Sequence, residues 1–153
     1  TKRWDPARFA QVADAMIEKG YKPVFFGDEG DEEFVQEAVS NMKYNPIVAT
    51  GAFSIGELAV ALKRCDLLIT NDSGPMYVAI SQDVPVVALY GPSSTKLYGP
   101  YTPNAIAVTA QPPCLGCAGS MKHKCDDMQC MNRITVEQVV EAALKMLNGE
   151  GNY

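Results

Sequence analysis

The chain has 153 residues, of which 47% are hydrophobic and 20% charged, and 13 basic against 18 acidic residues give a net charge of −5. This composition excludes a disordered tail, a collagen-like fibre and a coiled coil, and the lack of a basic run disfavours nucleic acid as a partner. The longest strongly apolar stretch, 84–90, is too short to span a membrane, and no signal-peptide pattern opens the chain. We therefore expect one cytoplasmic domain over residues 1–153.

The first third of the chain alternates helix and strand signals. Asp5 is predicted as an N-cap, with Pro6 at the first helical position and Gly20 past the helix end. Apolar periodicity then predicts, in chain order, a strand at 23–26, a helix at 34–42 and a strand at 47–49.

The middle of the chain continues this alternation. Ser54 and Glu57 form a capping box ahead of a helix. A buried strand is predicted at 67–70, and the run 71–75, Asn-Asp-Ser-Gly-Pro, turns it into the next helix. Another strand is predicted at 84–90.

The last third is less regular. A strand is predicted at 105–109, and Thr135 with Gln138 caps a final helix. The stretch 91–133 contains five prolines and four of the five cysteines, so its two halves are predicted to be functional loops. Short apolar strands alternating with amphipathic helices predict an α/β fold, a Rossmann-like doubly wound parallel sheet with helices on both faces.

The turn at 71–75 carries the strongest functional signal. Ligands of open parallel sheets bind at the carboxyl ends of the strands, where free helix amides favour an anion and Gly74 allows close approach to the backbone. Asp72 would repel a phosphate, so we expect it to accept a hydrogen bond from a sugar hydroxyl. Together these features indicate a nucleotide-sugar. The more frequent role of such a run is simpler: Asp72 or Ser73 caps the helix that Pro75 begins.

Two segments resemble the signature of glycosyltransferase family 9, the heptosyltransferases of lipopolysaccharide biosynthesis. They are LLITNDSGPMYVA at 67–79 and VPVVALYGP at 84–92. Other parts of the chain are also similar to the family: Thr1–Trp4, 54–66, Tyr98–Tyr101 and the cysteine segment up to Ile134. The resemblance thus covers nearly the whole chain.

The resemblance implies the C-terminal half of a GT-B glycosyltransferase, the donor-binding domain, with an acceptor domain expected before Thr1. The implied transferase reaction is inverting, and moves heptose or a related sugar from a nucleotide-sugar, expected to be ADP-heptose, to a lipopolysaccharide core acceptor. The family's base is an acid of the N-terminal domain, so no catalytic residue is expected in this chain, and the chain alone should transfer nothing. No metal is needed for transfer in GT-B enzymes.

The resemblance also implies donor contacts. It assigns the donor diphosphate to Lys2, the phosphate to Ser73 and Gly74, a donor hydroxyl to Asp72, the ribose to Asp31 and the adenine to Phe53. Solvated helix-start positions are the alternative for Lys2 and Asp31, and core packing is the alternative for Phe53. Tyr77 stands where the family usually has His, which replaces a titratable imidazole with a neutral phenol, so donor preference or rate is expected to differ. The single histidine, His123, lies in the cysteine loop.

The Cys-rich loop at 112–133 suggests a metal site. Four thiolates can hold one tetrahedral zinc, and the spacing of Cys114, Cys117, Cys125 and Cys130 fits a structural site. Unligated cysteines are an equally weighted alternative, and an iron–sulfur cluster ranks below zinc. A disulfide framework is disfavoured because cytosolic thiols stay reduced.

Three functions are consistent with these patterns. The leading one is the donor-binding half of a heptosyltransferase, with peripheral association at the inner membrane as an added expectation. The alternatives are a non-enzymatic nucleotide-binding module and a structural zinc-binding domain.

Overall fold

The fold alternates helices and parallel strands. The computed structural model describes residues 2–110 and 128–150. The helices are α1 (Pro6–Glu18), the 3-10 helix η1 (Glu29–Asp31), α2 (Glu32–Ser40), α3 (Ile55–Leu62), α4 (Gly74–Ser81), α5 (Thr95–Tyr98), α6 (Gln129–Asn132) and α7 (Val136–Leu147). The strands are β1 (Val24–Gly27), β2 (Ile47–Thr50), β3 (Leu68–Asn71), β4 (Val86–Tyr90) and β5 (Ala105–Thr109).

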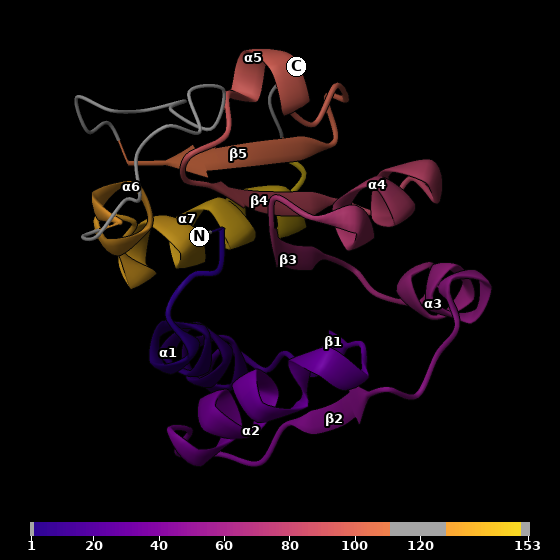
Figure 1. Cartoon of the computed structure of the whole chain (residues 1–153), viewed down its shortest axis with the longest axis vertical. Helices are drawn as coiled ribbons and strands as arrows, with labels where there is room; N and C mark the ends of the chain where they lie inside the picture. Colours follow the sequence, from indigo (N-terminus) through magenta and orange to yellow (C-terminus); the bar gives the residue numbers. More distant parts are fainter. Residues whose placement is uncertain (1, 111–127, 151–153) are drawn as a thin grey trace.

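The strands pair in parallel in two groups (Figure 1). One sheet pairs β1 with β2, with Phe25 opposite Val48, and the other has the order β3-β4-β5, with Asn71 opposite Leu89. The predicted doubly wound α/β fold with parallel strands is confirmed, although its strands form two hydrogen-bonded sheets rather than one continuous ladder.

Helices cover both faces of the three-stranded sheet. In Figure 1, α7 packs against one face of β4 and β5, and α4 covers the opposite face of β3 and β4. β4 is buried along its whole length, and its side chains alternate between two cores because successive residues of a strand point to opposite faces. Val87 and Leu89 belong to the core under α7, whereas Val86, Ala88 and Tyr90 belong to the core under α4.

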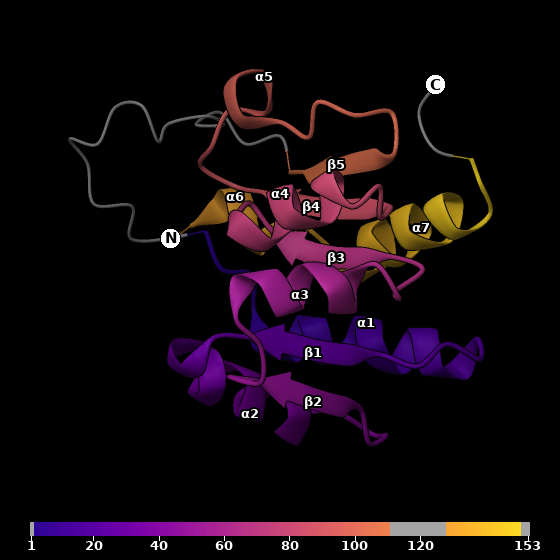
Figure 2. The ribbon, with the colours of Figure 1, turned by 90° about the vertical axis from the view of Figure 1, so that its right-hand side faces the viewer.

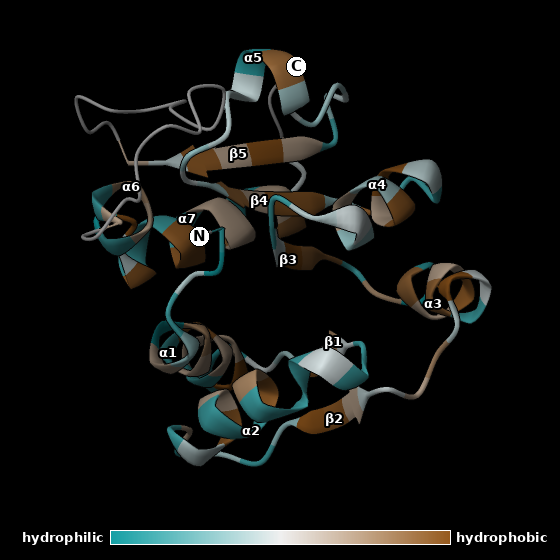
Figure 3. Cartoon of the chain, in the orientation of Figure 1, coloured by the Kyte–Doolittle hydropathy of each residue, from teal (hydrophilic) through white to brown (hydrophobic). Residues whose placement is uncertain are grey.

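The two-stranded sheet is less enclosed. α2 packs on β1, and α1 lies between α2 and α7, so it joins the two parts of the molecule. Phe26 of β1 packs against the core under α4, together with Leu58 and Leu68. Side-chain packing rather than backbone pairing therefore connects the two sheets. Figure 3 shows that apolar residues also run along α3, where Ile55 and Val60 are exposed.

The predicted helix starts are confirmed by their caps. The Asp5 side chain accepts a hydrogen bond from Arg8 N, with Pro6 in the first turn. Reciprocal capping boxes begin α3 at Ser54–Glu57 and α7 at Thr135–Gln138. None of the described helices is long and apolar enough to cross a membrane.

Several element boundaries differ from the prediction. β4 begins at Val86 rather than residue 84, since Pro85 has no N–H to give to the ladder. β3, predicted to be buried, is mostly half-buried because it is the edge strand of its sheet. The predicted helix at 34–42 ends at Ser40. α5 and α6 were not predicted, because a helix of four residues is too short to show apolar periodicity.

Candidate functional site

The carboxyl ends of the strands bring the predicted site residues to one edge. β1 leads into the acidic turn 28–31, β3 leads into Asp72–Gly74, and β4 leads into Gly91. Figure 2 shows that β1, β2 and β3 point toward the side on which the N-terminal end of the chain lies. This is the edge at which ligands of open α/β sheets bind.

The N-terminal segment Lys2–Trp4 crosses this edge. Trp4 is 1% exposed, and its indole N–H donates to the Ile134 carbonyl at 3.2 Å. Its backbone N–H donates to Asn71 Oδ1 at 3.0 Å, directly at the end of β3. A buried indole and a strand-end amide thus hold the backbone beside Lys2 in place.

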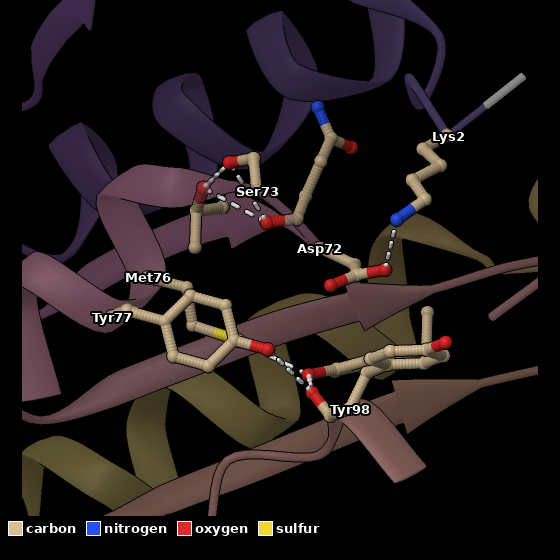
Figure 4. A network of polar contacts seen from close by, with 9 residues as sticks. Lys2, Asp72, Ser73, Met76, Tyr77 and Tyr98 are labelled. Atoms are coloured by element: carbon tan, nitrogen blue, oxygen red, sulfur yellow. Dashed lines mark hydrogen bonds and ion pairs between the residues drawn. The ribbon is translucent and has the colours of Figure 1, made fainter. Parts of the chain in front are cut away.

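Lys2 and Asp72 form an ion pair, with Lys2 Nζ 2.7 Å from Asp72 Oδ2 (Figure 4). Asp72 N–H donates to the Leu89 carbonyl, which continues the β3–β4 pairing by one residue and fixes the backbone of the acid. The Asp72 side chain is only 6% exposed, whereas the Lys2 side chain is 48% exposed. The two residues assigned to the donor diphosphate and to a donor hydroxyl are therefore in contact.

The first turn of α4 lies next to this pair. Ser73 occupies the N-cap position, but its side chain makes no capping hydrogen bond and its Oγ lies 3.3 Å from the Asn71 carbonyl. Asp72 is engaged by Lys2 instead. A Cβ added at Gly74 would meet no atom within 4 Å, so the space over this glycine is open. The simpler alternative predicted that Asp72 or Ser73 caps this helix. Neither side chain makes the capping hydrogen bond.

Tyrosines border the same site (Figure 4). The hydroxyls of Tyr77 and Tyr90 both donate to the Tyr98 carbonyl, which ties α4 and β4 to the end of α5. Burial raises the pKa of the Tyr90 phenol well above its usual range, and the Asp72 carboxylate adds to the shift. Tyr90 therefore stays a neutral hydrogen-bond donor beside Asp72.

Asp31 lies on the other side of the edge, after β1. Its Oδ1 is 2.6 Å from Arg3 Nη2, and the Arg3 guanidinium lies 5.5 Å from the centre of the Phe34 ring. A Cβ added at Gly27 would lie 2.8 Å from Asp31 Cβ, so the absence of a side chain there allows the acid to approach the strand end. Asp31 also accepts from Asp28 N–H in the box that begins η1, which is the structural role expected as its alternative.

Phe53 precedes α3 on the same side as Asp31. Its ring is 6.0 Å from the Phe26 ring, and the residue is 43% exposed. This exposure argues against the alternative in which Phe53 packs in the core.

Of the four cysteines considered for zinc, only Cys130 is described. It is buried on α6, whereas Cys114, Cys117 and Cys125 lie outside the described residues. Within 2–110 and 128–150, no group of three or more His, Cys, Asp or Glu side chains could hold a metal ion.

Three residues at this edge were not predicted as site residues. Arg3 pairs with Asp31, Asn71 accepts from Trp4, and Tyr90 lies beside Asp72. A phenol in an otherwise apolar strand is a signal that could have identified Tyr90, because a buried hydroxyl needs a partner. Arg3 contacts Asp31, 28 positions away, and Asn71 contacts Trp4, 67 positions away. No local sequence pattern predicts contacts over such separations.

A hollow of about 380 Å³ lies at the opposite edge. Its lining includes Tyr21 and Pro23 before β1 and Ile47 at the start of β2, and it is mostly apolar. It faces the amino ends of the strands, away from Lys2 and Asp72, so it is separate from the candidate site.

Comparison with protein families and known proteins agrees with this geometry. Residues 1–126 match the family model of glycosyltransferase family 9 (heptosyltransferase). The chain is 30% identical to lipopolysaccharide heptosyltransferase 2 of Salmonella typhimurium, in an alignment that covers 98% of this chain and 44% of that protein. It therefore spans about half the length of the curated relatives it matches.

Two solved structures are similar over nearly all of the chain. A family 9 glycosyltransferase from Veillonella parvula is 48% identical with a TM-score of 0.82, and covers 97% of this chain and 42% of its own. ADP-heptose lps heptosyltransferase II from E. coli is 29% identical with a TM-score of 0.82, covering 97% of this chain and 43% of its own. The two alternatives, a nucleotide-binding module without transfer and a zinc-organised domain, are not favoured by these likenesses.

Proposed function

This chain belongs to glycosyltransferase family 9, the heptosyltransferases, and from that premise we propose that it binds the nucleotide-sugar donor of a glycosyl transfer. The observation that carries the proposal is the meeting of Lys2, Asp72 and the uncapped start of α4 at one strand edge. A cation and free helix amides suit a diphosphate, and a buried carboxylate beside them suits a sugar hydroxyl.

We propose these donor contacts along the edge. Lys2 faces the diphosphate, Ser73 and Gly74 offer backbone amides to a phosphate, and Asp72 accepts from a sugar hydroxyl. The remaining contacts are Asp31 to the ribose, Phe53 to the base and Tyr77 beside the sugar. The Arg3–Asp31 pair and the exposed Phe53 ring support a nucleoside on the β1 side of the edge.

The reaction we propose is an inverting transfer. An acceptor hydroxyl, deprotonated by a base from sequence outside residues 1–153, attacks the anomeric carbon. The bond between that carbon and the diphosphate oxygen breaks, and the nucleoside diphosphate leaves with the electron pair. Lys2 and the α4 amides stabilise the negative charge that develops on the leaving group.

ADP-heptose is the proposed donor and a lipopolysaccharide core sugar the proposed acceptor. The likeness to ADP-heptose lps heptosyltransferase II supports the donor, and the names of the curated relatives support the acceptor. We place the reaction in the cytoplasm with peripheral association at the inner membrane, which fractionation of cells would test.

Two glycines provide a sharp test. A Cβ at Gly74 or at Gly56 meets no atom within 4 Å, so Gly74→Ala and Gly56→Ala should both fold like the wild type. In the complete natural protein that contains this chain, Gly74→Ala should weaken ADP-heptose binding by roughly tenfold, about 1.4 kcal/mol, because the methyl group fills space the phosphate needs. Gly56→Ala is the control and should bind normally.

Calorimetric titration measures both affinities. Equal binding by Gly74→Ala and wild type would contradict a phosphate at this helix start. A thermal-shift screen tests which nucleotide base the donor carries, because a ligand that binds only the folded state raises the melting temperature. ADP-sugars should give a shift, and UDP-sugars should give none.

The structural zinc stays a prediction that concerns Cys114, Cys117, Cys125 and Cys130. Native mass spectrometry should detect one bound metal ion per chain. A mass that shows no bound metal ion would contradict it, with or without a disulfide.

A further inference from the structure

The Lys2–Asp72 pair is asymmetric in its access to solvent. Asp72 is almost fully buried, at 6% exposure, whereas Lys2 is about half exposed at 48%. Among the described residues, Lys2 is the only side chain that hydrogen bonds the Asp72 carboxylate. Within residues 2–110 and 128–150, one half-exposed cation thus compensates the charge of this carboxylate.

The segment that carries Lys2 is anchored two residues further on, at Trp4. The Trp4 backbone N–H donates to Asn71 Oδ1, and the Trp4 side chain is buried. Figure 4 shows Lys2 reaching down to Asp72, with Ser73 following on the same turn. The ammonium group donates to the Asp72 carboxylate, and an anion bound at the start of α4 would compete with that carboxylate for the same positive charge.

A buried carboxylate that loses its counterion is strongly disfavoured unless another donor replaces it. A diphosphate that draws Lys2 away creates this situation. A nucleotide-sugar brings the replacement donor, a hydroxyl of the transferred sugar. A nucleoside diphosphate lacks that sugar, and we assign its ribose hydroxyls to Asp31, on the other side of the edge.

We propose that the Lys2–Asp72 pair makes the site discriminate between the nucleotide-sugar substrate and the nucleoside diphosphate product. The inference rests on the proposed function and adds a specificity to it. With the sugar attached, Lys2 moves to the diphosphate and the sugar hydroxyl takes its place on Asp72. After transfer, Asp72 recaptures Lys2 and the product is released.

A competing explanation is simple repulsion between Asp72 and the diphosphate. The two explanations differ in whether the effect of Asp72 on ADP binding requires Lys2. If the acid acts by competing for the lysine, neutralising it strengthens ADP binding only while Lys2 is present. If the acid acts by repulsion alone, neutralising it strengthens ADP binding equally without the lysine.

A double-mutant cycle separates these explanations. Calorimetry with ADP and with ADP-heptose is carried out on the complete natural protein that contains this chain, as wild type, Asp72→Asn, Lys2→Met and the double variant. We expect Asp72→Asn to bind ADP about fivefold more tightly than wild type and to lose its preference for ADP-heptose, a coupling of ordinary size for residues in contact. In the Lys2→Met background the same change should leave ADP binding nearly unaltered.

The chain offers a matched control. Lys145 Nζ is also 2.7 Å from a carboxylate, Glu141 Oε1, and its side chain is 50% exposed, close to the value for Lys2. Lys145→Met and Glu141→Gln lie on α7 and should change neither affinity. Thermal denaturation checks folding, and Asp72→Ser, with the same expected direction, replaces Asp72→Asn if that variant does not fold.

Either of two results would overturn the inference. One is an equal gain in ADP affinity from Asp72→Asn with and without Lys2, and the other is a loss of affinity for ADP as large as that for ADP-heptose. Failure of the wild-type protein to bind ADP or ADP-heptose would instead overturn the proposed function.

Discussion

The strands of both sheets end at the edge where we propose the site, but the two sheets are built differently. All five residues of β4 are buried, whereas Ile47 and Val48 of β2 are 56% and 42% exposed. The same contrast holds for the ion pairs at the edge: Asp72, after β3, is 6% exposed, and Asp31, after β1, is 33% exposed.

The difference in burial indicates which side of the candidate site is held more rigidly. The proposed diphosphate end follows β3, which is paired with the fully buried strand β4, and the proposed nucleoside end follows β1, in a sheet held by fewer buried groups. Charge interactions weaken in water, so the Lys2–Asp72 pair should matter more than the exposed Arg3–Asp31 pair. Three experiments test this contrast and a fourth tests the cap of α3, which lies between the two sheets in the chain; they follow in order of decreasing expected effect.

The largest effect should come from the buried strand. Leu89→Ala removes a fully buried side chain from β4 and should lower the free energy of unfolding by about 2 to 5 kcal/mol. The matched change Ile47→Ala, on the exposed strand β2, should change it by less than about 0.5 kcal/mol. Urea denaturation measures both, and equal losses would remove the contrast between the sheets.

The second-largest effect on stability should come from a buried carboxylate that holds the turn before β2, in the less enclosed two-stranded part of the molecule. The Asp14 side chain is buried and accepts from Lys43 N–H at 2.9 Å and Tyr44 N–H at 3.3 Å, which fixes the turn before β2. Asp14→Ala leaves these donors unpaired and should cost about 1 to 3 kcal/mol. Asp14→Asn keeps one acceptor oxygen and should cost less. Denaturation that shows no difference between the two variants would mean that these hydrogen bonds are not what holds the turn.

The exposed ion pair should contribute less. Arg3→Gln breaks the contact with Asp31, but the two side chains are 58% and 33% exposed, so the stability change should be within about 1 kcal/mol. Raising the salt concentration should reduce the change further. A loss of several kcal/mol in urea denaturation would show that the β1 side of the edge is as rigid as the β3 side.

The smallest effect concerns pH. Hydrogen bonds from the Ser54 hydroxyl and N–H lower the pKa of Glu57 below its ordinary value of 4.5. Because the folded state favours the carboxylate, this stabilisation is present above the ordinary pKa and is lost as the pH falls through the lowered one. An NMR titration should place the midpoint below 4.5, and Ser54→Ala should raise it. An unchanged midpoint in that variant would assign the shift to another cause.

Local signals predicted much of the fold. Asp5 with Pro6, Ser54 with Glu57 and Thr135 with Gln138 lie within three residues of each other, and each pair begins a helix where it was expected. The division into two sheets was not predictable in this way, because it depends on which strands exchange backbone hydrogen bonds over long separations.

The kind of site could be predicted from the sequence, but the contacts between its residues could not. The turn 71–75 identified the edge, yet nothing in the sequence pairs Lys2 with Asp72, 70 positions away, or Arg3 with Asp31. Such contacts arise only after the N-terminal segment crosses the strand ends. The role of Tyr90 likewise depends on Tyr98, which the fold brings to its hydroxyl.

The Ile134 carbonyl accepts hydrogen bonds from both the Trp4 indole and the Arg8 guanidinium, at 3.2 and 2.7 Å. One oxygen just before the last helix thus fastens the segment that carries the lysine. The position of Lys2 therefore depends on a junction more than 100 residues further along the chain, so a substitution that shifts the Ile134 carbonyl should also displace the segment that carries this lysine.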